Sequence, residues 1–97
     1  MNRILTIILI SLSLNPIAQV NLDSLWNVWN DKTQADTNRL KAMKQIAGDG
    51  YLFSQPDSAF YFAGLMYDFA KSVNNKKWMA NALNVQGVSF AIRGNWR

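Results

Sequence analysis

The sequence contains no cysteine, no histidine and no glutamate. The absence of cysteine excludes disulfides and thiol nucleophiles, and the absence of histidine removes imidazole bases and the commonest zinc ligands. Six aspartates are the only acidic side chains, and no two of them stand at a D-x-D spacing. We therefore expect no catalytic residue, no metal site and no cofactor, and we predict that this chain by itself is not an enzyme.

Charge is sparse as well. Only 16% of the 97 residues are charged, with ten basic side chains against six acidic ones. An excess this small and this scattered does not form the basic stripe with which proteins bind nucleic acid, so no nucleic-acid partner is expected. A hydrophobic content of 49% excludes a disordered chain, and the length allows one small domain.

The N-terminal residues have the pattern of a secretion leader. Arg3 precedes an apolar run over residues 4–14, which Pro16 closes. The run is too short to cross a bilayer, which takes about 20 residues, and Ala18 supplies the small residue that signal peptidase requires. We predict a signal peptide over residues 1–18, an exported chain, and a mature segment that does not span the membrane. A buried hydrophobic helix or a retained anchor is the alternative.

After residue 20, apolar residues recur at spacings of three and four, which is typical of helices. The sequence predicts four of them, at about residues 22–29, 36–53, 54–73 and 77–94. Asp36 and Ser54 are the predicted N-caps of the second and third helices, because their side-chain oxygens can accept backbone N–H groups. Pro56 is tolerated in a first turn, and Asn74 is expected to end the third helix.

The third predicted helix carries two apolar stripes. One is bulky and is expected to face inward, and it consists of Phe62, Leu65, Met66 and Phe69. The other is small enough to let a neighbouring backbone approach closely, and it consists of Ala59, Ala63, Gly64 and Ala70.

A translation by forty residues places the second predicted helix on the fourth. The superposed pairs are Met43 on Leu83, Ile46 on Gln86, Ala47 on Gly87 and Gly50 on Phe90. Helix pairs that recur at such a period cannot bury both faces alone and must stack on neighbours. The sequence therefore predicts an all-α fold made of antiparallel helix pairs of an α-solenoid.

The motif Leu83-x-x-Gln86-Gly87-x-x-Phe90, with Gly94-Asn95-Trp96 after it, resembles the first helix and turn of a tetratricopeptide repeat, or TPR. Residues 43–59 look like the preceding unit. The resemblance covers residues 36–97, about one and a half repeats of the long-turn type, and residues 19–35 form a short capping helix and connector before them. Gln86 departs from the pattern, since its slot is usually apolar.

The leader, the Trp-bearing first helix and these repeats together resemble the start of bacterial proteins with exported TPR arrays. In those proteins a membrane helix and an output domain follow, often a class III adenylate or guanylate cyclase and sometimes a histidine kinase. The resemblance implies a protein-interaction or sensory module on the periplasmic or cell-envelope side, the N-terminal fragment of a larger exported or membrane-anchored signalling protein. The alternative is a regulatory segment of a cyclase or kinase whose catalytic domain lies beyond residue 97. A free-standing secreted helical protein is a third interpretation.

Four polar residues are the predicted peptide-binding face. They are expected to point away from Phe62 and Phe69, and their phenol and amide groups could hold the backbone of a protein or peptide partner. These residues are Tyr61, Tyr67, Asn81 and Asn84.

The fourth predicted helix is apolar around most of its circumference. Such a helix is normally buried, so a further helix is expected to cover it and the isolated chain is expected to self-associate through that side. The apolar residues concerned are Trp78, Met79, Leu83, Val85, Val88, Phe90 and Ile92.

Overall fold

A computed structural model describes residues 21–94, and within that range the chain contains helices and no strand. The elements are α2 (Leu22–Asn30), α3 (Asp36–Gln45), the π-helix η1 (Ile46–Tyr51), α4 (Pro56–Ser72) and α5 (Lys76–Gly94). The predicted all-α class is confirmed. The predicted signal peptide over residues 1–18 lies outside the described residues.

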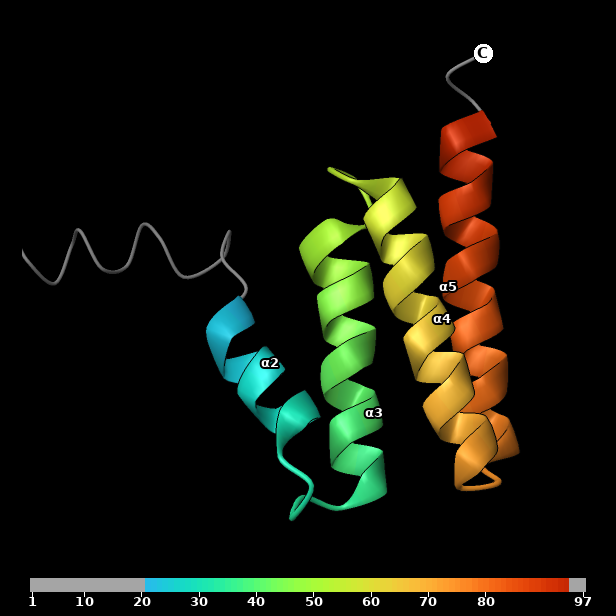
Figure 1. The fold of residues 1–97 in the computed structure, drawn as a ribbon. Coiled ribbons are helices and arrows are strands. Elements are labelled where there is room, and N and C mark those ends of the chain that lie inside the picture. Colours follow the sequence, from blue (N-terminus) through green and yellow to red (C-terminus); the bar gives the residue numbers. More distant parts are fainter. Residues whose placement is uncertain (1–20, 95–97) are drawn as a thin grey trace, which may run out of the picture.

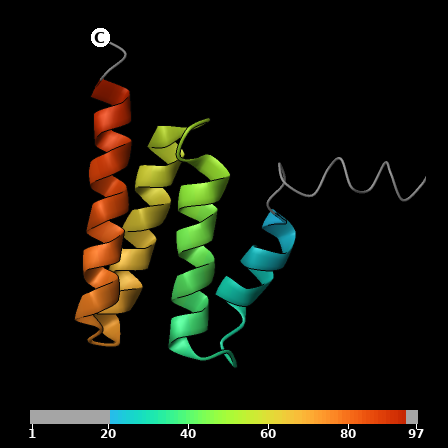
Figure 2. The ribbon, with the colours of Figure 1, turned by 180° about the vertical axis from the view of Figure 1, so that it is seen from behind.

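The helices lie side by side in chain order (Figure 1). Each helix runs antiparallel to the one before it, so that α3 and α5 point in the same direction, and the view from behind shows the same succession (Figure 2). The helices α2 and α5 lie on the two outer sides, and the α3–α4 pair lies between them.

The second predicted helix is present, but its last turn is not an α-helix. The α-helical part ends at Gln45, and η1 continues the same rod through Tyr51 with wider turns. This corrects the predicted α-helix to Phe53. Two glycines lie in η1, and Gly50 faces the start of α2, because a Cβ built there would be 2.9 Å from Cδ2 of Leu22. The wider turns of η1 therefore lie where two glycines disfavour an α-helix and where α2 comes close.

The predicted N-caps are wrong at two of the helices. Ala35 is the N-cap of α3 and Gln55 that of α4, and neither helix has a side-chain cap. Asp36 is instead the first residue of α3, where its charge still favours the helix N-terminus. The predicted helix end at Asn74 is confirmed by its left-handed backbone, with φ of 56°. The next residue caps α5, because the Asn75 side chain accepts the N–H of Trp78 at 3.2 Å.

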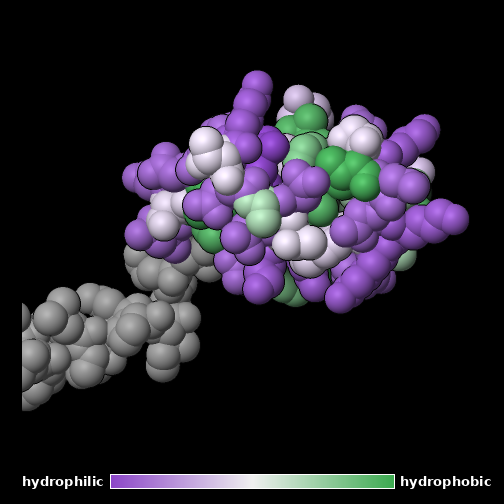
Figure 3. All heavy atoms as spheres, turned by 90° about the horizontal axis from the view of Figure 1, so that it is seen from below, coloured by the Kyte–Doolittle hydropathy of each residue, from purple (hydrophilic) through white to green (hydrophobic). Residues whose placement is uncertain are grey.

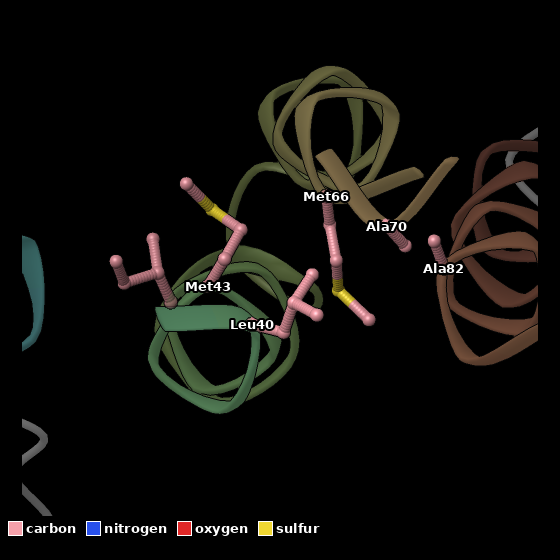
Figure 4. Packing of buried hydrophobic residues seen from close by; sticks show 6 residues of the cluster. Leu40, Met43, Met66, Ala70 and Ala82 are labelled. Atoms are coloured by element: carbon pink, nitrogen blue, oxygen red, sulfur yellow. The ribbon is translucent and has the colours of Figure 1, made fainter. Parts of the chain in front are cut away.

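The core lies where α3, α4 and α5 meet (Figure 4). Met66 of α4 extends between α3 and α5 beside Leu40, and Ala70 and Ala82 face one another across the α4–α5 contact. The fully buried residues of this cluster are Leu40, Met43, Ile46, Met66, Ala70 and Ala82.

Burial on α4 falls mainly on the small stripe. Ala59, Ala63 and Ala70 are fully buried, as the prediction of a close neighbouring backbone requires. Of the bulky stripe only Met66 is fully buried, while Phe62, Leu65 and Phe69 are half-buried and pack against the core cluster. Phe62 and Phe69 are half-buried because they face α2.

Aromatic contacts attach α2 to the rest of the molecule. No residue of α2 is buried, but the rings of Trp26 and Trp29 meet those of Phe62 and Phe69 edge to face, with centroids 5.2 and 5.5 Å apart. Arg39 of α3 adds a third contact. Its Nε donates a hydrogen bond of 2.8 Å to the carbonyl of Trp29, and its guanidinium lies 4.4 Å from the Phe69 ring centroid.

Hydrogen bonds between neighbouring residues hold the connector from α2 to α3. The Asp31 carboxylate accepts hydrogen bonds from the hydroxyl of Thr33 at 2.6 Å and from its backbone N–H at 2.9 Å. These two bonds, the hydroxyl first, lower the pKa of Asp31 below its ordinary value, because they favour the ionised carboxylate.

The Trp29→Ala variant is expected to release α2 while the other helices remain folded. It removes the ring that meets Phe69 and lies 5.5 Å from the Arg39 guanidinium, while the hydrogen bond from Arg39 to the backbone carbonyl remains. An isolated helix of this length is marginal in water, so loss of the ring contacts should free it. Amide hydrogen exchange should show α2 losing its protection and α4 retaining it. Equal protection of α2 in the variant would show that the aromatic contacts do not hold this helix.

Candidate functional site

The outer side of α5 carries large apolar residues in contact with solvent. Leu83 is 53% exposed and Phe90 is 64% exposed, and they stand seven residues apart with Gly87 between them. That spacing puts all three on one side of the helix. We call these residues, Leu83, Gly87 and Phe90, the outer stripe. Val88 is 40% exposed on another side of α5.

The equivalent residues of α3 and η1 are buried. Met43, Ile46 and Ala47 occupy the repeat positions of Leu83, Gln86 and Gly87, and all three are fully buried. They pack in clusters that include Met66 and Ala63 of α4. Two of these buried residues, Met43 of α3 and Ala47 of η1, therefore have exposed counterparts on α5, Leu83 and Gly87.

An open hollow adjoins the outer stripe where α4 begins and α5 ends. Its volume is about 890 Å³, and Phe53 on its rim is 80% exposed. The residues lining it are Phe53, Ser54, Pro56, Asp57, Phe90, Arg93 and Gly94.

Arg93 fixes the geometry of this end. Its Nη1 donates a 2.8 Å hydrogen bond to Asp57, and its guanidinium lies 5.2 Å from the Phe60 ring and 5.3 Å from the Phe90 ring. Its Nε is buried and has no hydrogen-bond partner. The aspartate that the sequence places in the first turn of α4 therefore joins α4 to α5.

Gln86 has a structural role that accounts for its departure from the repeat pattern. Its Nε2 donates to the backbone carbonyl of Phe60 at 3.3 Å. Gly64 makes room for this amide, because a Cβ built at Gly64 would lie 3.3 Å from Nε2. A polar side chain in this slot can thus bind the α4 backbone directly.

A second, separate depression lies between the parallel helices α3 and α5. It has a volume of about 530 Å³, and the π-helix borders it. We call it the α3–α5 groove. Its lining residues are Lys41, Lys44, Gln45, Gly48, Asp49, Trp78 and Val85.

The structure does not bring the four predicted peptide-binding residues onto one face. Tyr61 is 62% exposed, whereas Tyr67 is half-buried against the main core cluster. On α5, Asn81 and Asn84 lie about 140° and 160° around the helix from Gln86, which contacts α4. The two asparagines therefore point away from the tyrosines.

Asn81 is not among the residues lining the α3–α5 groove, but it lies on the same side of α5 as two residues that are. It lies three residues after Trp78 and four before Val85, which places all three on one side of α5. Its amide donates to the carbonyl of Lys77 at 3.1 Å. The prediction missed Lys41, Lys44 and Gly48, although the forty-residue translation pairs Lys41 with Asn81 and Lys44 with Asn84.

Residues 21–94 contain no group of three side chains able to hold a metal ion. No helix in that range is long and apolar enough to cross a membrane. Figure 3, which looks along the helices from below, shows mostly hydrophilic side chains with a few hydrophobic ones between them.

Comparison of the sequence with protein-family models and curated proteins, and of the fold with solved structures, finds no significant match. The function is therefore inferred from the surfaces described above.

Proposed function

We propose that this chain is a protein-interaction module of stacked helix pairs, in which the outer stripe of α5 docks a further helix of the α4 kind. One observation carries the proposal. Leu83 and Phe90 are more than half exposed, while Met43, the counterpart of Leu83 in the preceding repeat, is fully buried in the cluster that includes Met66 of α4. Exposed apolar surface of this type marks contact sites. The small stripe of α4 defines the chemistry of the occupant, a helix with alanine or glycine where it meets the stripe.

The module fits the long-turn TPR type, and we place it in the N-terminal part of a larger exported or membrane-anchored bacterial signalling protein. The support is the leader-like residues 1–18 and the repeat motifs over residues 36–97. In the alternative, the module regulates an adenylate or guanylate cyclase or a histidine kinase whose catalytic domain lies beyond residue 97. In both cases the role of these helices is binding or sensing.

A chain extended by a second α4 tests the docking proposal. In the extended chain, residues 54–72 follow directly on Arg93, as the forty-residue translation requires. We expect the added segment to form a helix that is protected from amide exchange, and we expect the free energy of unfolding to rise as Leu83 and Phe90 become buried.

The matched control carries Leu83→Asp and Phe90→Asp in the same extended chain. Charged side chains on the stripe should leave the added segment unprotected. If the added segment exchanges as fast without these substitutions as with them, then α5 does not accept a helix of this kind and the proposal is wrong.

The chain without an extension is expected to self-associate. Its outer stripe and Phe53 are exposed apolar surface that a second copy can cover. Sedimentation should show a concentration-dependent increase in mass, which the Leu83→Asp substitution abolishes. A single monomeric species at all concentrations, with no binding of a dye that reports apolar surface, would rule this out.

A further inference from the structure

We propose that α5 pairs with the α5 helix of a second copy of this chain, antiparallel and about a two-fold axis that passes level with Val85. The inference rests on the proposed function, because it names the partner that covers the outer stripe where no further helix does. Such a pair uses the outer stripes of both copies and leaves neither of them open, so association stops at the dimer.

The middle of α5 carries no charge. Lys77 and Arg93 are consecutive charged residues in the sequence, and residues 78–92 between them are all uncharged. The exposed side of a helix normally carries charged or polar residues, whereas this one carries Leu83 and Phe90, which are more than half exposed. Although the chain has a net charge of +4, two copies can therefore bring the middle of α5 together without placing like charges against each other.

Large and small residues alternate along the exposed side of α5 that includes the outer stripe. Ala80, Gly87 and Gly94 are small, Leu83 and Phe90 are large, and their spacings of three and four residues are those with which two helices pack along one seam. In the antiparallel pair, Leu83 of each copy lies opposite Gly87 of the other, and Ala80 lies opposite Phe90. The space above Gly87 is open, because a Cβ built there meets no atom within 4 Å. Each large side chain thus meets a small residue, and the two helices can approach closely.

The ends of the paired helices are complementary in charge. Lys76 is exposed and lies four residues before Ala80, on the same side of α5. The antiparallel pair places it opposite Gly94 of the other copy, which lines the hollow at the start of α4. Asp57 lines the same hollow, and its side chain is 80% exposed although it binds Arg93. The Lys76 ammonium can therefore pair with a carboxylate of the other copy, whereas a parallel pair would place the two Lys76 side chains together.

The size of the interface sets the expected affinity. One pair of helices buries less surface than a stable interface of standard size, so we expect a dissociation constant in the micromolar range or weaker. Sedimentation of the full chain should show a mass that rises with concentration and levels off at twice the mass of one copy. Growth beyond the dimer, or a monomer at all concentrations up to about 1 mM, would overturn the proposal.

Nitroxide labels on single cysteines test the direction and register of the pair. Asn84→Cys and Ala91→Cys each place one label at an exposed position, and the two positions lie seven residues apart on one side of α5. The helix rise puts the two copies of position 84 about 3 Å apart along the helix axis, and the two copies of position 91 about 18 Å apart. Electron spin resonance should show strong coupling at position 84 and much weaker coupling at position 91. Equal coupling at both positions, or no coupling at either, would overturn the antiparallel pair.

Two pairs of matched variants locate the interface. Gly87→Met should weaken association by about tenfold, because it fills the space that receives Leu83 of the other copy. Gly48→Met, at another open glycine outside α5, should change little. Lys76→Gln should weaken association by about threefold, whereas Lys77→Gln, which removes the same charge on another side of α5, should not. Equal losses within either pair would overturn the assignment of the interface.

The extended chain separates this inference from the docking proposal. If the added helix becomes protected and the chain without it stays monomeric, the docking proposal stands and the two-fold pair is wrong. If the labels report the antiparallel pair and the added helix stays unprotected, the outer stripe is an interface between copies and does not dock a helix of the α4 kind. If both proposals are right, the added helix should abolish the dimer, because it occupies the outer stripe.

Discussion

The Leu40→Ala substitution is expected to lower the free energy of unfolding by about 3 kcal/mol. Leu40 is fully buried in the cluster where α3, α4 and α5 meet, beside Met66. Truncation removes its contacts and leaves a cavity that the three surrounding helices cannot easily close. A domain of this size has a total stability of only about 4 to 11 kcal/mol, so the loss is a large fraction. Urea unfolding followed by circular dichroism measures it.

Leu83→Ala is the matched control for this substitution. The same atoms are removed, but Leu83 is 53% exposed on the outer stripe. Its truncation should cost less than about 1 kcal/mol at concentrations where the chain is monomeric. Equal losses at the two leucines would mean that another part of the chain already covers the outer stripe.

The Ala82→Leu substitution is expected to cost about 2 to 3 kcal/mol. Ala82 is fully buried, and its Cβ faces that of Ala70 across the α4–α5 contact (Figure 4). Alanine and leucine have similar helix propensities, so the loss would come from forcing the two helices apart. Thermal unfolding should show a lower midpoint, and α5 should exchange its amide hydrogens faster.

Ala80→Leu places the same side chain two residues earlier in α5, where Ala80 is exposed. It should leave the midpoint within a few degrees of the original value. A similar drop in both variants would show that α5 tolerates leucine poorly on every side, and that close α4–α5 packing is not the cause.

Periodicity alone was sufficient to predict the helices of this fold. Apolar residues at spacings of three and four predicted the helix at 22–29, which is α2, and Asn74 marked the end of the α4 region. These signals are local, because a helix is stabilised by contacts between residues three and four apart. The predicted caps were wrong. The N-cap positions are occupied by Ala35 and Gln55, each one residue away from the predicted Asp36 and Ser54.

The side of each helix that is buried depends on partners that are distant in the sequence. Phe62 and Phe69 were expected in the core, and they pack against the core cluster but stay half-buried, with their rings also meeting the tryptophans of α2. Tyr67 looked like a surface residue, but it packs on the core cluster. A stripe of alanines on α4 allows closer approach than a stripe of phenylalanines, and the arrangement follows from that difference. The π-helix gave no sequence signal beyond its two glycines.

The central claim is that a repeat position buried under α4 on α3 is exposed on α5. Thiol labelling of single-cysteine variants tests it. The chain has no cysteine of its own, so Leu83→Cys and Met43→Cys each introduce one reporter at equivalent repeat positions. At concentrations where the chain is monomeric, the thiol at position 83 should react nearly as fast as in unfolded chain, and the thiol at position 43 only through unfolding. Strong protection of both thiols would contradict an open stack of helix pairs.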